Sequence, residues 1–455
     1  MRSLLYMGLV SAALVAAVVP ASAQSLTGAL ASTYSVNPEL NSARSQLRSI
    51  DEGISIARAG NRPTLSAGLD QSFATSRTIA NSGNSGSSSL PTAVSVTLTQ
   101  PLFQGFTVRN SIRQAESAVK AQRASLENTE QSVLLAAATA FEDVIQDREI
   151  VRLRRSDIRF LNEQVQAAQD RFEVGEGTRT DVSQAEARRA EAQSLLNFAI
   201  ANAEISEASF FQETGLRAGT LVDDVPIDRL LPKSVDAAVA LGQRIHPAII
   251  AALFDVDTAM FNVKAIEGTL LPSLNLSASA SSSFNQTSAT EQQDSATVGL
   301  SLTIPIYQGG LASAQVRQAK EDLGTSRIQV DLTRDAVRQN TVASFASYVA
   351  SVRSIQSART SVFAARLALD GVIEEQRVGQ RTTLDVLDAQ SELVAAQITL
   401  VSAERDKDVT GFQLLSAIGQ LSARRLGLNV QLYNPKEHTD AVRDKWFGLR
   451  TPDGR

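Results

Sequence analysis

The chain has 455 residues, a formal net charge of −5 and no cysteine. A chain without cysteine has no disulfide, no thiolate metal site and no lipid-modified N-terminal cysteine, and the acidic balance argues against a nucleic-acid-binding protein. Aromatic residues make up only 5% of the chain, a composition that suits long helices packed through small side chains better than one large globular core.

The first 23 residues have the pattern of a secretory signal peptide. Arg2 precedes an apolar run from Leu4 to Val19, and an A-x-A cleavage site follows at residues 21–23. The run is about 16 residues long, which is short for the alternative of a transmembrane anchor. We therefore expect an exported chain that starts at Gln24. Beyond this point we find no apolar run of about 18 residues, so a membrane role would depend on strands or a surface helix.

The exported sequence contains two similar halves. PLFQG at Pro101 recurs as PIYQG at Pro305, and FEVGEGTRTDV recurs as QRVGQRTTLDV, with one constant offset of 204 residues. A constant offset over such a distance predicts an internal duplication. The expected organisation is a first repeat at 24–220, a linker at 221–233, a second repeat at 234–420 and a C-terminal strap at 421–455.

Each repeat is predicted to contain a helix, two strands, a very long helix and a further helix. Strands are indicated by apolar residues that alternate with polar or small ones. Neither glycine nor proline occurs between Phe106 and Val174, and a helix over this stretch would be roughly 100 Å long at about 1.5 Å per residue. The predicted elements are strands 64–76 and 91–101 with helices 106–174 and 180–214, then strands 273–284 and 296–306 with helices 310–377 and 384–418.

The apolar residues of the long helix have coiled-coil spacing. Ile158, Leu161, Val165, Ala168 and Phe172 are separated alternately by three and four residues. A helix of this length and pattern must run beside other helices.

The strands fit either a soluble hairpin or tilted membrane strands. The polar segments that start at Arg77 and Asn285 have the composition of flexible, exposed loops. An open sheet edge in lipid leaves backbone groups unpaired, so membrane strands would require several chains to share one barrel, and three chains would supply twelve strands. Aromatic residues near the strand ends would then mark the two membrane interfaces, and in a soluble hairpin they would be ordinary core residues: Phe73 and Phe284 near the loops, Phe103 and Tyr307 near the long helices.

The motifs VGQRTTLDVLDAQ and PIYQGG, the duplication and the cysteine-free signal peptide resemble the TolC family of outer-membrane channels. The resemblance covers about Leu26 to Leu421. It implies a mainly α-helical homotrimer, in which a twelve-stranded transmembrane β-barrel with four strands per chain continues into a long periplasmic α-helical barrel. It also implies a passive exit duct in the outer membrane of a Gram-negative bacterium. An inner-membrane RND or ABC transporter and a periplasmic membrane-fusion adaptor would recruit this duct for efflux or type I secretion, without a cofactor.

The resemblance places a periplasmic entrance at the two helix turns. Contacts with the adaptor would be made by Val174, Gly175, Val378 and Gly379. A latch would join Arg381 to Thr180 and Asp181, whereas the alternative for this arginine is a solvated side chain at a turn. The best-known member of the family has a tyrosine as a second partner of the aspartate, and this position is Gln376 here, which puts the second latch bond in doubt.

The family carboxylates that narrow the entrance fall on Asp385 and Asp388. Rings of acidic side chains favour cations, and like charges at short range raise one another's pKa. Thr382 and Asp385 also fit a capping box, so Asp385 has a structural explanation of equal weight. Asp388 lies one turn deeper, and its counterpart in the first repeat is Gln184, so the duplication does not explain it.

No catalytic signature is found in the sequence. His246 precedes a proline and is expected to cap a helix, and His438 lies in the tail. The tail also contains the only tryptophan, Trp446, and is expected to form a strap on the outer surface of the helical barrel. The competing interpretation is a soluble periplasmic coiled-coil scaffold or adaptor. A substrate-selective porin is a weaker alternative, because porins have short periplasmic turns.

Overall fold

The computed structural model describes residues 24–287 and 290–454, so the predicted signal peptide at 1–23 lies outside the described residues. The chain divides into two compact units, each made from three separate segments. The first unit contains the chain up to Ser35 together with residues 136–227 and 354–408. The second unit contains residues 36–135 and 228–353 and the chain from Val409 onward.

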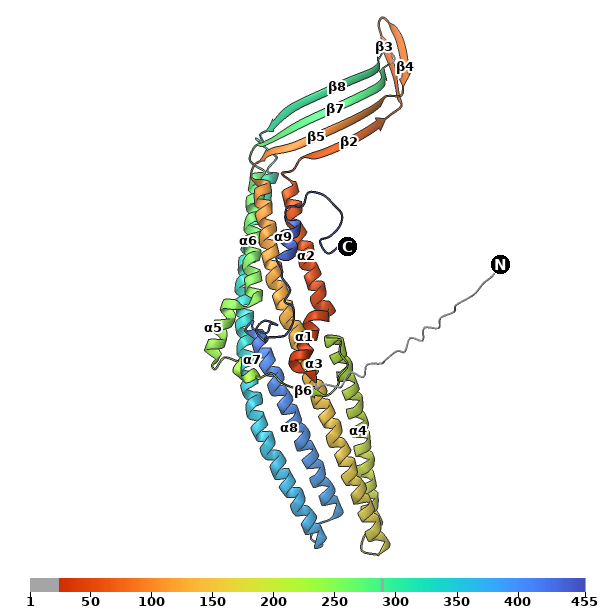
Figure 1. Ribbon diagram of the computed structural model, residues 1–455, viewed down its shortest axis with the longest axis vertical. Coiled ribbons are helices and arrows are strands. Elements are labelled where there is room, and N and C mark those ends of the chain that lie inside the picture. The colour runs from red at the N-terminus through yellow and green to blue at the C-terminus, as the bar shows by residue number, and fades with distance from the viewer. Residues whose placement is uncertain (1–23, 288–289, 455) are drawn as a thin grey trace, which may run out of the picture. The chain divides into compact units, whose positions relative to one another are not determined.

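Four long helices form two helical hairpins, whose turn ends lie in the first unit. The helices are α3 (Thr107–Glu173), α4 (Arg179–Thr214), α7 (Leu311–Arg377) and α8 (Thr383–Ala417) (Figure 1). Helices α3 and α7 have 67 residues each and begin 204 residues apart, which is the offset of the sequence motifs. All four observed helices begin and end within one residue of the predicted bounds.

The segment predicted as a linker contains regular structure. Strand β6 (Leu221–Val222) pairs in parallel with β1 (Gln24–Ser25), directly before α1 (Leu26–Val36). A 3₁₀ turn follows at Ile227–Arg229. Strands of two residues are too short to show a periodic signal, so their pairing depends on the arrangement of the surrounding helices.

The second unit carries one antiparallel sheet of four strands in the order β2-β5-β7-β8. A separate hairpin is formed by β3 and β4. The strand bounds are β2 Thr64–Gln71, β3 Ala74–Ala80, β4 Gly83–Ser89, β5 Thr92–Gln104, β7 Ser273–Thr287 and β8 Thr290–Thr303.

The two polar segments predicted as loops are largely strands, which corrects the sequence analysis. The segment from Arg77 belongs to the β3–β4 hairpin, and the segment from Asn285 extends β7 and β8. Conversely, β8 ends at Thr303 and not at 306. Backbone pairing between strands does not require apolar side chains, and here hydroxyl pairs such as Ser281 and Ser295, 2.9 Å apart, line the extension. The apolar alternation therefore underestimates the strand length.

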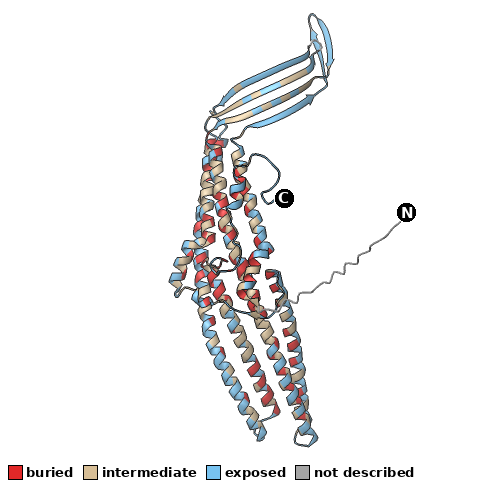
Figure 2. Cartoon of the chain, viewed as in Figure 1, coloured by how far each residue is buried: buried red, intermediate tan, exposed pale blue. Residues whose placement is uncertain are grey.

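The sheet has two chemically different faces. Its cross-strand register places Leu65, Leu98, Ala278 and Val298 in one row, and the row beside it on the same face contains Ala67, Val96, Ala280 and Ala296. The opposite face is lined by serine, threonine and glycine residues of the same strands. Leu65, Val298 and Leu300 are exposed in the single chain, and none of the four strands contains a residue drawn as buried (Figure 2).

Side-chain caps mark the starts of two helices in the second unit. Helix α2 (Pro38–Ala59) is capped by Asn37, and α6 (Pro247–Gly268) is capped by His246, whose Nδ1 accepts a 3.2 Å hydrogen bond from the Ala248 backbone N–H. The predicted capping role of His246 is therefore confirmed. Because α5 (Val235–Ile245) ends directly before this cap, the stretch Val235–Gly268 consists of two helices. It is also the single helical stretch among the described residues that is long and apolar enough to cross a membrane by length and composition.

The first PLFQG motif occurs where the chain passes from the sheet into α3. Gly105 has a φ of +58°, and a Cβ atom there would lie 2.1 Å from the carbonyl oxygen of Gly268 in α6. Only glycine permits this backbone approach. Beside it, the Thr107 hydroxyl donates a 3.1 Å hydrogen bond to the carbonyl of Ala265, so the start of α3 is joined to the end of α6.

Candidate functional site

Both helix turns of the first unit have the same backbone motif. Gly175 and Gly379 have φ values of +82° and +76°, the left-handed conformation that glycine adopts without strain. The next residue donates its N–H across six residues, from Glu176 to the Arg171 carbonyl and from Gln380 to the Glu375 carbonyl. This is the Schellman arrangement, which terminates α3 and α7 with their last carbonyls hydrogen-bonded.

The following helices begin with matching capping boxes. Thr382 accepts a 3.3 Å hydrogen bond from the Asp385 N–H, and its own N–H donates to the Asp385 carboxylate over 2.8 Å. Thr178 and Asp181 make the same pair of bonds at the start of α4. Donation from the Thr382 backbone and hydroxyl lowers the pKa of Asp385, and donation from Thr178 lowers the pKa of Asp181. In one chain the carboxylate of Asp385 is therefore held ionised by its cap.

The exposed tips of the turns carry apolar side chains. Val174 and Val378 occupy equivalent positions, and 71% and 70% of their surfaces are exposed. The glycine after each valine has open space around its Cα. The two tips therefore present equivalent small surfaces, which are available to a partner.

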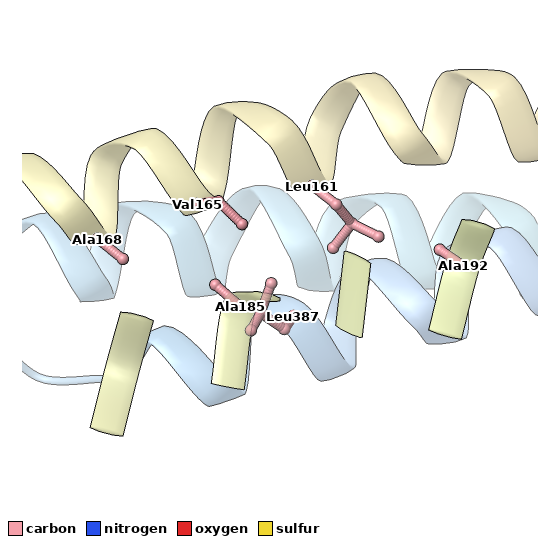
Figure 3. Packing of buried hydrophobic residues seen from close by; sticks show 6 residues of the cluster. All are labelled: Leu161, Val165, Ala168, Ala185, Ala192 and Leu387. Carbon is pink, nitrogen blue, oxygen red and sulfur yellow. The ribbon is translucent and has the colours of Figure 1, made fainter. Parts of the chain in front are cut away.

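Apolar packing joins the two hairpins behind the turns. Leu387 of α8 is 1% exposed and packs among Leu161 and Val165 of α3 and Ala185 of α4 (Figure 3). In the opposite direction, Phe160 of α3 packs against a cluster formed by α7 and α8. Since each hairpin inserts a large side chain into the other, the two turns are held at one end of the first unit.

Two polar contacts accompany this packing. The guanidinium of Arg188 in α4 donates a 2.7 Å hydrogen bond to the carboxylate of Asp388 in α8. Two residues further along α8, the buried Gln390 donates a 2.9 Å hydrogen bond to the buried Asp157 of α3. Burial raises the pKa of Asp157. No sequence motif singles out Arg188, Gln390 or Asp157, although Arg188 lies only one turn from Gln184, the counterpart of Asp388.

The predicted latch residues do not pair with one another in the single chain. Arg381 donates a 2.9 Å hydrogen bond to Glu375, across the turn, and its second nitrogen lies 3.9 Å from the Asp385 carboxylate. Gln376 donates over 3.2 Å to the Thr383 hydroxyl. Thr180, in the first turn of α4, lies next to Asp181, which is engaged by Thr178. A latch between Arg381 and Asp181 is therefore not observed within one chain and stays a prediction.

The four predicted interface aromatics lie at the two ends of the sheet. Phe284 pairs with Thr92 near Phe73, at the end of the sheet next to the β3–β4 hairpin. Phe103 ends β5 and makes an edge-to-face contact with Phe106, with 5.1 Å between ring centroids. Tyr307 follows β8 and is 85% exposed. Within the described residues no group of three or more histidine, cysteine, aspartate or glutamate side chains is arranged to hold a metal ion.

Comparison with known proteins identifies the family to which the chain belongs. The family profile described as "Outer membrane efflux protein" matches residues 30–215 and 242–420 of the chain. The outer membrane efflux protein BepC of Brucella suis is 46% identical over 436 residues, which cover 95% of this chain and 93% of that protein. The outer membrane protein TolC of Escherichia coli is 27% identical over 88% of this chain and 83% of its own length.

Solved structures of outer-membrane channels have the same fold. The Campylobacter jejuni CmeC channel superposes with a TM-score of 0.75 at 15% identity, covering 92% of this chain and 89% of that one. The open state of the Neisseria gonorrhoeae MtrE channel gives a TM-score of 0.69 at 20% identity, covering 88% and 90%. The alternative of a soluble scaffold or adaptor is not supported, because the matching family and BepC are described as outer membrane efflux proteins.

Proposed function

This chain belongs to the outer membrane efflux protein family and is a protein of the outer membrane, and on that premise we propose that three copies form one exit duct. The four-stranded sheets of the three chains would close a twelve-stranded barrel in the membrane. The helical hairpins would form a tunnel in the periplasm, with the turns at its entrance. Such a duct is passive, and its opening would depend on recruitment by other proteins.

The two-faced sheet is the observation that carries this proposal. In a membrane barrel, alternate residues face lipid and the water-filled interior. The row of Leu65, Leu98 and Val298 supplies an apolar face, and the intervening serines and threonines supply a polar one. Because β2 and β8 are the edges of this sheet, they would pair with neighbouring chains and leave no edge in lipid. Phe73 and Phe284 would mark one interface, and Phe103 and Tyr307 the other.

Single cysteines test this placement, because the chain has none of its own. Leu300→Cys lies on the apolar face and Ser301→Cys, its neighbour in β8, on the polar face. In proteoliposomes we expect a membrane-impermeant maleimide to label Ser301→Cys through the interior and to leave Leu300→Cys unmodified. Chemical crosslinking in the same membranes should yield a trimer. Equal labelling of both cysteines, or a monomer, would contradict the proposal.

The turns are proposed as the contact surface for a periplasmic adaptor, and the adaptor would link the duct to an RND or ABC transporter. Val174, Gly175, Val378 and Gly379 support this role because they form two exposed, equivalent surfaces. BepC is named as an efflux protein and AprF of Pseudomonas aeruginosa as an alkaline protease secretion protein, so both effluxed compounds and secreted proteins are candidate cargo. Photo-crosslinkers at Val174 and Val378 should capture the adaptor in cells, whereas one at exposed Leu332, in the other unit, should not.

We further propose that Asp385 and Asp388 of three chains narrow the entrance and that a latch between neighbouring chains closes it. Arg381 would bind Thr180 and Asp181 of the next chain, and Gln376 would supply a weaker additional hydrogen bond. In one chain Arg381 is bonded to Glu375, which would compete with the latch. Glu375→Gln should therefore lower the open probability in planar bilayers, and Arg381→Gln should raise it. Glu374→Gln, which removes the neighbouring pair with Arg377, is the matched control.

A further inference from the structure

The C-terminal segment is held against α2 by a buried polar cluster in the second unit. Asp51 of α2 is fully buried and accepts hydrogen bonds from Thr439 over 2.7 Å and from His438 over 3.1 Å. Arg123 of α3 donates to the Thr439 hydroxyl over 2.7 Å. His438 and Thr439 lie in the first turn of the short helix α9 (Glu437–Val442), which lies beside α2 (Figure 1).

Further contacts lead the segment toward the sheet. Ser55 donates a 2.6 Å hydrogen bond to the Val442 carbonyl, and Arg58 pairs with Asp444. Arg62 then donates over 2.6 Å to the Lys445 carbonyl and lies 4.9 Å from the centroid of the Trp446 ring. Asp51, Ser55 and Arg58 lie about one helical turn apart on α2, and Arg62 follows just after the helix. The segment therefore runs along α2 toward the point where β2 begins, two residues after Arg62.

The side chains that follow this clamp are apolar and exposed. Trp446 is 65% exposed, Phe447 90% and Leu449 fully exposed. Three neighbouring large apolar side chains in water are unfavourable and indicate a surface that meets another phase or partner. Three cationic residues lie close to them in sequence: Arg443, Lys445 and Arg450. The carboxylate of Asp444 within this stretch is already paired with Arg58.

We infer that residues 445–450 form a membrane anchor that binds the phospholipid surface at the periplasmic side of the outer membrane. A tryptophan and a phenylalanine among basic residues are the side chains favoured at a headgroup interface. The anchor is continuous with the helix end of the sheet, where Phe103 and Phe106 lie, because Arg62 and β2 are adjacent in sequence. This inference rests on the proposed function, in which that end of the sheet marks the membrane boundary. The clamp on α2 would hold the anchor at a fixed depth.

The single tryptophan provides a direct test in the full-length protein. The protein is reconstituted into vesicles of phosphatidylethanolamine with a minority of phosphatidylglycerol, in which part of the lipid carries bromine. Bromine near the headgroup should reduce the emission of Trp446 by roughly half, and bromine near the bilayer centre should reduce it less, because indole rings settle at the interface. Replacing both Phe447 and Leu449 with serine should weaken this quenching.

Two matched variants separate this inference from the proposed function. In a Trp446→Phe background, Leu300→Trp reports on the apolar face of the sheet and Val378→Trp on a turn far from lipid. One outcome would overturn the anchor alone: bromine near the bilayer centre quenches Leu300→Trp, but Trp446 is quenched no more than Val378→Trp. The sheet would then still lie in the membrane. A blue-shifted but unquenched Trp446 would also overturn the anchor, by placing the segment against a neighbouring chain. If Leu300→Trp is itself unquenched, the membrane position of the sheet and the anchor are both wrong.

Discussion

Arg188 of the first repeat binds Asp388 of the second repeat over 2.7 Å. The aspartate that the family resemblance assigns to the pore constriction is therefore paired with a cation inside its own chain. Both side chains are partly exposed, and such ion pairs stabilise a protein by only about 0–1 kcal/mol. The pair consequently matters more for the charge at the proposed entrance than for folding.

Removal of Arg188 should increase the negative charge at the entrance. In planar bilayers, Arg188→Gln is expected to strengthen block by multivalent cations several-fold, and Asp388→Asn is expected to weaken it. The double variant should behave like Asp388→Asn, because the arginine has no carboxylate left to neutralise. Arg189→Gln, on the adjacent residue, is the control and should change little. If Arg188→Gln and Arg189→Gln alter the block equally, the pair does not control the entrance charge.

The two roles of Asp385 can be separated by comparing the repeats. Thr382→Ala removes the cap of α8 and Thr178→Ala the cap of α4, and each should cost about 1 kcal/mol of local stability. Hydrogen exchange at the first turn of each helix measures this loss. Asp385→Asn keeps an acceptor for the Thr382 N–H but removes the charge, so it should weaken cation block with little change in exchange. A variant with unchanged block would leave Asp385 with the capping role alone.

Glu142 gives the first unit a pH-dependent stability. The residue is 4% exposed, and its Oε1 has no hydrogen-bond partner in the part of the chain that the structure describes. Burial, reinforced by the nearby carboxylates of Asp223 and Asp408, raises the pKa of Glu142 to about 8. The folded state therefore holds a proton that the unfolded state releases above its ordinary pKa of 4.5.

The sign of this effect follows from the number of bound protons. Between pH 4.5 and 8 the folded state binds more protons than the unfolded state, so the contribution of Glu142 to the free energy of unfolding falls as the pH rises. Glu142→Gln should remove this decrease and be more stable than the parent at pH 9, by on the order of 4 kcal/mol. Denaturant unfolding of both proteins across this range measures the difference. Parallel stability profiles would show that the carboxyl does not titrate in this way.

Leu387 should be the principal apolar link between the two hairpins. Leu387→Ala removes a buried side chain of α8 that packs against α3 and α4, and such a change costs about 2–5 kcal/mol. Thermal unfolding should detect this loss together with faster hydrogen exchange at both turns. Val378→Ala, at an exposed tip, should leave stability unchanged while reducing adaptor crosslinking. Equal stability of the two variants would mean that the hairpins are held together elsewhere.

Features that depend on residues close in sequence were predicted well. Thr382 and Asp385 are three residues apart, so their capping box can be identified without knowledge of the fold. The left-handed conformations of Gly175 and Gly379, which end two long helices, are likewise local features, although they were not predicted. The bounds of α3 and α7 were accurate because a stretch without glycine or proline and with a regular apolar period has few alternatives to a helix.

The strands of the sheet were predicted in position but not in length. Residues from Arg77 and Asn285 are polar on both faces, and they pair because the preceding residues bring two backbones together. Pairing of this kind leaves no periodic pattern of apolar side chains in the sequence. The register that gathers Leu65, Leu98 and Val298 into one row is also a property of the assembled sheet, since a shift by one residue would reverse every face.

The sequence by itself determined the long helices, their caps and turns, the two-faced strands and the membership in a family, because each depends on local pattern or on identity along the chain. The tertiary structure decided which charges meet. Arg188 reaches Asp388, Arg381 binds Glu375 instead of Asp181, and Trp446 lies on Arg62 beside the sheet. These partners come from distant segments or from the opposite side of a turn, and they are selected by which helix faces pack together. This packing depends on the whole chain, so it cannot be predicted from a short motif.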